Sequence, residues 1–344
     1  MIQRDENSLG TDLEHELDHP GHFWEVTCGT RIFLTGGTGF FGKSLLSYFS
    51  ENNLGIKKLI VLSRHPEKLN NIINTNSFPF EIEYIKQDIR KPIKFNQPVD
   101  YLIHAAAESS TSIGMDKPIL MRDVVVQGTK NVLEYARMQR VKRVLFISSG
   151  AVYGKQPSGL SHLHEEYESA PDPLNPLNAY GCAKRQAENL CALYHHHYGI
   201  DYVVARCFAF VGPYLPLDAH YAIGNFIRDG LKGGPIVVKG DGITIRSYLY
   251  ADDLAEWLWT ILLKGNIGEA YNVGSDQAIA IDDLARLVSN CFNDKLEVIN
   301  KGNPDDKLDR YLPKVEKIKN ELGVLERVAL VDGIKRTIAF HNKK

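Results

Sequence analysis

The sequence predicts an α/β fold: a doubly wound parallel sheet with a smaller C-terminal α/β lobe. Three observations predict it. A glycine-rich turn near residue 36 joins an apolar run to a helical pattern, and apolar runs then alternate with helical patterns as far as residue 206. After Gly212-Pro213, glycine and proline divide the chain into shorter pieces. Repeated strand–helix order gives parallel strands, whose carboxyl ends form the usual ligand site.

The elements follow in chain order. Residues 59–62 form a continuous apolar run, as expected for a strand buried on both faces of a parallel sheet. The other expected strands cover 31–35, 82–85, 99–104, 144–147 and 202–206, and the expected helices cover about 119–138 and 178–198, with further helices beginning at 252 and 281.

We divide the chain into three parts. Residues 1–29 are polar and acidic and form an N-terminal helical extension, with a short helix expected at about 12–17. Residues 30–212 form the sheet domain, to which the later segment at about 243–275 returns. Residues 213–344 make up most of the smaller lobe.

Composition excludes several classes of protein. A net charge of −2 without a basic run argues against nucleic-acid binding. No apolar stretch reaches the length of a membrane span, and no signal peptide opens the sequence. The five cysteines show no CxxC spacing, so we expect free thiols in a reducing cytoplasm and no metal site.

The glycine turn predicts a dinucleotide site. Gly36 permits a tight turn, Gly39 allows the backbone to approach phosphates, and Gly42 allows the helix to pack closely on the strand. A strand precedes this turn and a helix follows it, so the backbone N–H groups of the helix N-terminus would face an anionic diphosphate.

Tyr180 and Lys184 lie four residues apart, on one face of a predicted helix. A phenol has a reference pKa near 10. A neighbouring ammonium and a cationic nicotinamide ring would lower the pKa of Tyr180 and make it a base. This spacing is common, and by itself it also fits a surface aromatic beside a solvated lysine. Ser149, directly after an apolar strand, would add a hydroxyl at the strand end, and the three residues together predict a hydride-transfer site.

Six segments, 35–42, 104–108, 148–154, 180–184, 206–213 and 246–253, resemble the successive motifs of the extended short-chain dehydrogenase/reductase superfamily, and of its NAD-dependent epimerase/dehydratase family in particular. The resemblance covers nearly all of residues 30–340. It implies a Rossmann-type sheet domain and a nucleotide-sugar-binding C-terminal lobe. It also implies that Tyr180 is the base or acid, that Ser149 polarises the reacting oxygen, and that Lys184 holds the nicotinamide ribose.

The resemblance extends to binding residues. Those implied for the cofactor are Gly36, Thr38, Gly39, Phe40, Phe41, Gly42, Ser63, Arg64, Asp88, Ile89, Ala105, Ala106, Ala107, Tyr180 and Lys184. Those implied for the substrate are Glu108, Ser109, Ser149, Gly150, Asn225, Lys239, Arg246 and Arg310. Asn225 and Arg246 would hold the diphosphate, since a guanidinium fork matches phosphate oxygens; a surface salt bridge is the alternative for Arg246. The family also implies a homodimer through the helices near 120–137 and 187–198, where the pattern alone indicates only core.

Departures from the family pattern bear on the reaction. Dehydratases resemble this chain but carry an Asp-Glu pair where it has Gly150 and Ala151, and decarboxylases carry a glutamate at Ala151. Elimination of water by that route is therefore not expected. Glu108 is a nearby carboxylate that could equally serve only as a cap. Ala209 replaces a frequent asparagine and Lys239 a frequent aromatic residue, which leaves the nucleobase and the sugar open.

The end of the second strand bears on the cofactor. An acidic residue there selects NAD, whereas an arginine accommodates the 2′-phosphate of NADP. The chain has Ser63-Arg64-His65 and no carboxylate before Glu67, which favours NADP over NAD, although Arg64 stacked on adenine would leave NAD acceptable.

We expect an NAD(P)-dependent epimerase that oxidises a nucleotide-linked hexose transiently and reduces it again. The alternatives are an NADPH-dependent reductase of a nucleotide-linked 4-keto-6-deoxy sugar, a 4,6-dehydratase that uses Glu108, and a nucleotide-sensing regulator on the same fold.

Overall fold

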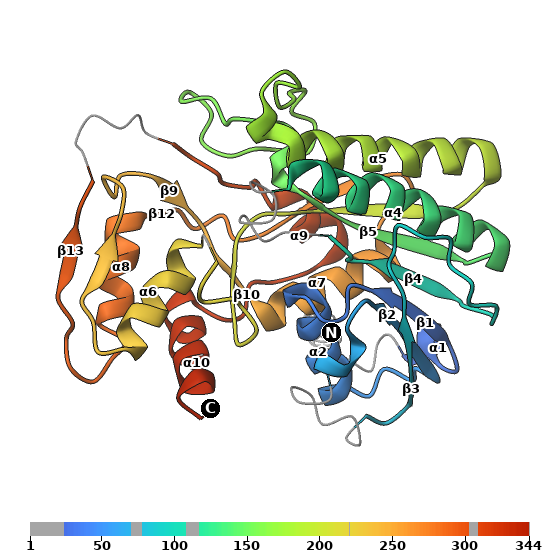
Figure 1. Cartoon of the computed structure of the whole chain (residues 1–344), viewed down its shortest axis with the longest axis horizontal. Helices are drawn as coiled ribbons and strands as arrows, with labels where there is room; N and C mark the ends of the chain where they lie inside the picture. The colour runs from blue at the N-terminus through green and yellow to red at the C-terminus, as the bar shows by residue number, and fades with distance from the viewer. Residues whose placement is uncertain (1–23, 70–77, 108–116, 220, 303–308, 344) are drawn as a thin grey trace, which may run out of the picture.

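The structure is a computed structural model, and it describes residues 24–69, 78–107, 117–219, 221–302 and 309–343 (Figure 1). Its centre is a seven-stranded sheet in the order β11-β6-β5-β4-β1-β2-β3, in which every neighbouring pair is parallel. This arrangement confirms the predicted doubly wound α/β fold. The strands are β1 (Arg31–Thr35), β2 (Lys58–Ser63), β3 (Glu81–Lys86), β4 (Tyr101–His104), β5 (Arg143–Ser149), β6 (Tyr202–Cys207) and β11 (Ala270–Val273).

Helices cover both faces of this sheet, which explains why its strands are apolar on both sides (Figure 1). On one face, α2 (Phe40–Glu51) packs beside α7 (Ala251–Lys264), and the rings of Phe49 and Trp259 lie 5.0 Å apart. On the other face, α4 (Pro118–Gln139) packs beside α5 (Ala179–Tyr198). A short helix, α1 (Trp24–Thr27), precedes β1, and the helix expected near 12–17 lies outside the described residues.

The strand order reverses between β1 and β4. From β1 the chain continues to β2 and β3 on one side, whereas β4, β5 and β6 extend on the other. The register pairs Thr35 of β1 with His104 of β4 and with Leu62 of β2, so the carboxyl ends of these strands lie level. In doubly wound sheets, this reversal opens a ligand crevice at the carboxyl ends of the strands.

The C-terminal part has its own apolar core, formed where α6 (Ala222–Leu231), α8 (Ile281–Ser289) and α10 (Leu330–Asn342) meet three small sheets. These sheets pair β7 (Phe210–Val211) with β10 (Leu249–Tyr250), β9 (Ile245–Arg246) with β12 (Ile279–Ala280), and β8 (Ile236–Val238) with β13 (Val298–Asn300). Helix α9 (Glu316–Leu322) lies against β11, and three short 3-10 helices complete the described elements: η2 (Pro66–Lys68), η4 (Gly150–Tyr153) and η5 (Pro176–Asn178).

Two elements of the large sheet follow parts of the small lobe in the chain. Helix α7 and strand β11 come after α6, β8 and β9, yet they cover and extend the seven-stranded sheet. The chain therefore crosses repeatedly between its two cores. Among the described helices, none combines the length and the apolar character needed to cross a bilayer.

Candidate active site

The glycine turn after β1 is held in close contact with the end of β4. Gly36 has a φ of +76°, in the left-handed region, and a Cβ added there would lie 2.7 Å from backbone atoms of Ala105 and Ala106. A Cβ on Gly42 would collide with the oxygen of Gly36. A Cβ on Gly39 would lie 3.4 Å from that same oxygen, which is an ordinary contact. Gly36 and Gly42 are therefore required by packing within the chain, whereas Gly39 leaves room on the open side of the turn.

The N-terminus of α2 can bind an anion. Gly39 is its N-cap, and no side chain caps the helix there. The first backbone N–H groups of a helix have no partner within it and carry partial positive charge. The side chains of Phe40 and Phe41 pack on Phe210, with ring centroids 6.2 and 5.5 Å away, so these two residues can offer a diphosphate only their backbone. This cradle fits a dinucleotide.

The end of β2 faces the same turn. Ser63 Oγ lies 3.0 Å from Thr38 Oγ1 and accepts a hydrogen bond from the backbone N–H of His65. The exposed Arg64 follows Ser63, and its charge helps to hold the pKa of Asp88 down at about 2, although the hydrogen bond from Arg90 contributes most. The structure thus brings Arg64 and Asp88, both predicted at the adenosine end, into electrostatic contact.

Ile89 is only 5% exposed and lies against Gly128 of α4. Its backbone oxygen accepts a hydrogen bond from Asn131. The side chain therefore packs in the core, and a ligand could meet only its edge.

A buried histidine fixes the end of β4. His104 Nδ1 lies 2.8 Å from Thr35 Oγ1, and Nε2 lies 3.1 Å from Thr129 Oγ1. Because the Thr129 hydroxyl donates to the oxygen of Val125, His104 must donate through Nε2 and accept through Nδ1. Burial, together with the charge of Lys184, lowers the pKa of His104 to about 3, so the ring is neutral.

The same network reaches the predicted cofactor residues. Thr35 Oγ1 also accepts from the backbone N–H of Ala106, so the segment 105–107 is anchored beside the glycine turn. Glu108 and Ser109, which follow it, lie outside the described residues.

The three predicted catalytic residues come together at the ends of β5 and α5. Ser149 ends β5 and caps η4, since its Oγ accepts from the backbone N–H of Ala151 at 3.2 Å. Tyr180, in the first turn of α5, is half-buried, and Ser149 lies close enough to influence its pKa. Lys184 lies one turn further along, 3% exposed, and its Nζ donates to the backbone oxygen of Ile147 at 2.7 Å.

Burial sets the pKa values at this centre. It raises the pKa of the Tyr180 phenol above its ordinary value, and the nearby Ser149 hydroxyl acts in the opposite direction. The Lys184 Nζ lies 5.8 Å from the centroid of the tyrosine ring, and burial lowers its own pKa to about 8. The predicted lowering of the Tyr180 pKa by Lys184 and a nicotinamide ring together stays a prediction, since in the chain alone burial has the largest effect on this pKa.

Polar side chains behind Ser149 tie β5 to α5 and β6. Ser148 Oγ donates to Glu188 Oε1 at 2.5 Å, and Arg206 forms an ion pair with the other Glu188 oxygen at 2.8 Å. Arg206 also donates to the phenol oxygen of Tyr153. This network fixes the last residues of β5 and hence the position of Ser149.

Two predicted substrate residues lie on adjacent backbone segments. Arg246, in β9, pairs with Asp309 at 2.6 Å and donates to the backbone oxygen of Ile245. Residues 309–311 run beside β9, where Ile245 bonds to the backbone of both Asp309 and Tyr311. The Nε of Arg310 is buried and has no hydrogen-bond partner among the described residues, as expected of a donor kept for a ligand.

Two residues that the sequence did not indicate complete this centre. A Cβ on Gly150 would lie 2.6 Å from the Tyr311 hydroxyl and 2.7 Å from the Phe208 ring, and these two rings stack with centroids 4.6 Å apart. The Tyr311 hydroxyl lies close enough to Ser149 for that residue to lower its pKa, against the larger effect of burial, which raises it. Its position next to Arg310 was the one available signal, since the remaining contacts join distant parts of the chain.

The other two predicted substrate residues lie in the C-terminal lobe. Asn225, in α6, accepts a hydrogen bond from Arg228 at 3.0 Å. It lies one turn after Tyr221, a phenol close enough to Tyr180 to influence its pKa. Lys239 is exposed just after β8.

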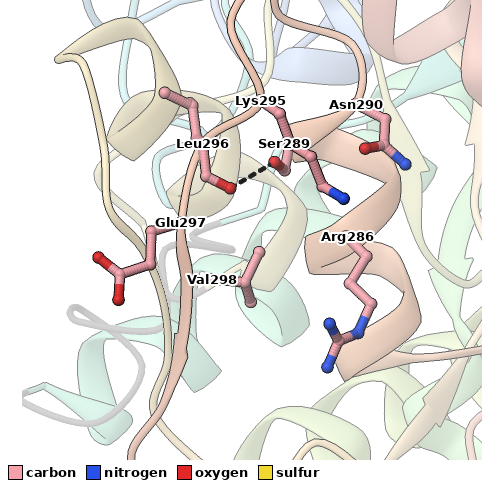
Figure 2. A pocket seen from close by; sticks show the side chains of 7 residues that line it. All are labelled: Arg286, Ser289, Asn290, Lys295, Leu296, Glu297 and Val298. Atoms are coloured by element: carbon pink, nitrogen blue, oxygen red, sulfur yellow. Dashed lines mark hydrogen bonds between the residues drawn. The ribbon is translucent and has the colours of Figure 1, made fainter.

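The linings of two surface pockets contain none of the predicted site residues. The larger, of about 430 Å³, lies between α8 and β13, and its lining shares no residue with the predicted site (Figure 2). The smaller, of about 290 Å³, contains Glu188 and Arg206. Within the described ranges, no group of three His, Cys, Asp or Glu side chains is placed to hold a metal ion.

The sequence and the fold are similar to those of known proteins. The profile of the "NAD dependent epimerase/dehydratase family" matches residues 32–274. The chain is 30% identical over 312 residues to UDP-glucuronic acid decarboxylase 3 of Arabidopsis thaliana, covering 88% of this chain and 86% of that protein. It is 29% identical to a putative UDP-glucose 4-epimerase of Methanocaldococcus jannaschii, covering 89% and 97%.

Among solved structures, the fold is similar to that of UDP-glucose 4-epimerase from Thermotoga maritima, determined with UDP-glucose. The TM-score is 0.79 at 24% sequence identity, over 91% of this chain and 99% of that one.

Proposed function

The chain belongs to the NAD-dependent epimerase/dehydratase family, and from this premise we propose that it is an NAD(P)-dependent epimerase of a nucleotide-linked hexose. The family profile and the relatives support a nucleotide-sugar-modifying enzyme of the extended short-chain dehydrogenase/reductase type. The choice of epimerisation within that class rests on the residues around Ser149.

The observation that carries the proposal is the lack of an acid/base pair after Ser149. Gly150 and Ala151 have no side chain that could transfer a proton. The Tyr311 hydroxyl and the Phe208 ring fill the space where a side chain of residue 150 would lie. Elimination of water needs such a pair, whereas removing a hydride and returning it needs only a base and a hydrogen-bond donor at the reacting oxygen.

Different residues of the chain carry out the separate steps of this reaction. Tyr180 removes the proton of the sugar hydroxyl and later returns it, while Ser149 donates a hydrogen bond to the same oxygen. Lys184, buried beside Tyr180, supplies positive charge when protonated and so favours the phenolate. A bound nicotinamide dinucleotide supplies the acceptor and donor of hydride. Arg246 and the buried Nε of Arg310 bind the substrate diphosphate.

Product analysis tests the proposal. Protein carrying its copurified dinucleotide is incubated with UDP-, dTDP-, CDP- and GDP-hexoses, and the sugars are followed by NMR and mass spectrometry. We expect two hexoses to interconvert without net consumption of dinucleotide. Tyr180→Phe should abolish turnover and keep dinucleotide binding. Tyr214→Phe, a phenol that packs on Phe340 of α10, is the matched control and should keep both. Turnover retained by Tyr180→Phe would refute the assignment of the base.

A second candidate is an NADPH-dependent reductase of a nucleotide-linked 4-keto-6-deoxy sugar, and the exposed Arg64 at the end of β2 favours it. The same arginine supports a preference for NADP over NAD. Stoichiometric NADPH consumption with a keto sugar would identify the reductase and exclude the epimerase.

Two further reactions are outcomes of the same assays. A 4-keto product that disappears in Glu108→Ala would indicate a dehydratase, and release of CO₂ from UDP-glucuronate would indicate a decarboxylase.

We also propose that the chain forms a homodimer through α4 and α5. Both helices carry large apolar side chains on their solvent-facing surface: Ile119 (76% exposed), Met138 (67%), Tyr198 (57%) and Leu193 (44%). Large apolar side chains exposed on both helices support this choice of interface. Sedimentation analysis of Met138→Glu beside the wild type tests it: the wild type should sediment as a dimer and the variant as a monomer.

A further inference from the structure

Resting on the proposed function, we propose that Asp309 is a counterion that the substrate diphosphate displaces from Arg246. In the free protein the Asp309 carboxylate pairs with Arg246, so a diphosphate binds this arginine only in exchange for the carboxylate. Asp309 thereby lowers the affinity of the site for nucleoside diphosphates and for the sugars that carry them.

A chain of contacts connects this ion pair to the catalytic residues. Gly150 follows Ser149, and a Cβ on Gly150 would lie 2.6 Å from the Tyr311 hydroxyl. The guanidinium of Arg246 lies 6.0 Å from the centroid of the Tyr311 ring. Asp309 pairs with this guanidinium at 2.6 Å. The diphosphate of a nucleotide sugar is attached directly to the sugar, so a sugar held at Ser149 brings its diphosphate into this neighbourhood.

The backbone places a second arginine beside the first. The N–H of Ile245 donates to the backbone oxygen of Asp309 at 2.8 Å, and the N–H of Tyr311 donates to that of Ile245 at 3.2 Å. Ile245 and Arg310 thus form a parallel bridge, next to Arg246 in the chain. The Nε of Arg310 is buried and lacks a hydrogen-bond partner among the described residues. Because buried donors in proteins are nearly always paired, this group points to a ligand that accepts a hydrogen bond.

Exchange is favoured over binding of both anions to the same guanidinium. Arg246 uses Nη1 for the backbone oxygen of Ile245 and Nη2 for Asp309, so some of its five donors remain. Two anions on one guanidinium nevertheless repel each other strongly at a separation of a few ångströms. Asp309 is the anion that can leave, since its side chain is 42% exposed and makes no other hydrogen bond within the described part of the chain.

Charge gives the direction of the effect. Arg246 and Arg310 supply positive charge for the two phosphates, and the carboxylate of Asp309 cancels part of it. The apparent affinity of a ligand falls by the fraction of molecules in which its binding group is free. For a partly exposed ion pair, this fraction corresponds to a loss of affinity of about fivefold, and repulsion by the carboxylate adds to the loss.

Calorimetric titration of UDP, dTDP, CDP and GDP into protein carrying its copurified dinucleotide tests the inference. Asp309→Asn keeps the shape of the side chain and removes its charge. At low salt it should bind the tightest of the four diphosphates about fivefold to tenfold more tightly than the wild type does. Because salt screens charges, this gain should shrink below about twofold at about 0.5 M salt. Asp309→Ser should show the same gain, which guards against a folding defect in one variant.

A double-mutant cycle separates displacement from general repulsion. In an Arg246→Met background the carboxylate has no arginine to occupy, so Asp309→Asn should change the affinity by less than about twofold. The same gain in both backgrounds would overturn the inference, because it would show that Asp309 acts only as a nearby negative charge.

Glu269→Gln is the matched control. Glu269 pairs with Lys317 at 2.7 Å, and the exposure of the two side chains is similar to that of Asp309 and Arg246. It directly precedes β11 and so lies at the amino end of the parallel sheet, away from the ligand end. The control should therefore bind diphosphates as the wild type does.

The outcomes distinguish this inference from the proposed function. Unchanged or weaker binding by the two Asp309 variants at low salt, or no binding by any of the proteins, would overturn the inference. If the variants gain affinity but the wild type interconverts no hexoses, the proposed function fails and the role of Asp309 stands. Interconversion by the wild type without a gain in the variants has the opposite meaning.

Discussion

The free-energy cost of burying the Lys184 charge at the centre of the site can be measured from the pH dependence of stability. Its side chain is 3% exposed, and burial lowers its pKa from 10.5 to about 8. Between these two values the unfolded chain still holds the proton that the folded protein has released, so stability rises with pH. At about 1.4 kcal/mol per pKa unit the whole rise is about 3 kcal/mol, of which about 2 kcal/mol is complete by about pH 9.5.

The comparison with Lys184→Met isolates this effect, because the titration of other groups cancels between the two proteins. Urea denaturation at closely spaced pH values should show the free energy of unfolding of the wild type gaining about 2 kcal/mol over that of the variant between about pH 7 and pH 9.5. Lys130→Met, at an exposed position of α4, should follow the wild type within about 0.5 kcal/mol throughout. A constant difference between the wild type and Lys184→Met would refute the reasoning.

Three other substitutions test separate parts of the structure. Gly36→Ala, whose Cβ would meet the Ala105 backbone at 2.7 Å, should cost about 2 kcal/mol more in urea denaturation than Gly29→Ala, which shares a positive φ but opens onto free space; equal losses would contradict the close approach. Burial raises the pKa of Asp253 from 3.8 to about 6. The folded protein therefore keeps a proton that the unfolded chain releases, and the wild type should lose about 2 kcal/mol relative to Asp253→Asn between about pH 4 and pH 6; a difference independent of pH would exclude this. Arg64→Asp should lower the preference for NADPH over NADH at least about tenfold in fluorescence titrations, since a carboxylate repels the 2′-phosphate; an unchanged ratio would remove Arg64 from the cofactor site.

Much of the large sheet could be predicted because its signals are local. The apolar run at 59–62 became β2, and the helical pattern at about 119–138 became α4, with ends one residue away. The two-residue strands of the small lobe, such as β9 and β12, are too short for periodicity to indicate them. The pairing of β11 with β6 could not be predicted from the sequence either. It depends on the fold of the small-lobe segments that lie between these two strands in the chain.

The candidate site divides in the same way. The glycine turn and the spacing of Tyr180 and Lys184 are properties of short segments, and the structure places them as strand-end and helix-face residues. Burial is a property of the folded whole, so the spacing of Tyr180 and Lys184 could not show that burial raises the pKa of Tyr180 in the chain without a nicotinamide ring. Tyr311 could not be predicted, because it lies beside Gly150 only when the C-terminal segment lies along β9.

Strand β11 belongs to the large sheet but follows α6, β8 and β9 in the chain. The large sheet can therefore be completed only late in synthesis. The glycine turn leaves the ribosome early, together with β1 to β4. At about 5–20 residues per second, Tyr311 follows Gly36 by roughly 15 to 55 s. Until β11 arrives, the backbone of β6 forms an open strand edge, the kind of surface on which nascent chains aggregate. A growing chain therefore contains the glycine turn, proposed here to bind the dinucleotide, well before it contains Tyr311, so the proposed cofactor site is synthesised before the centre around Ser149 is complete.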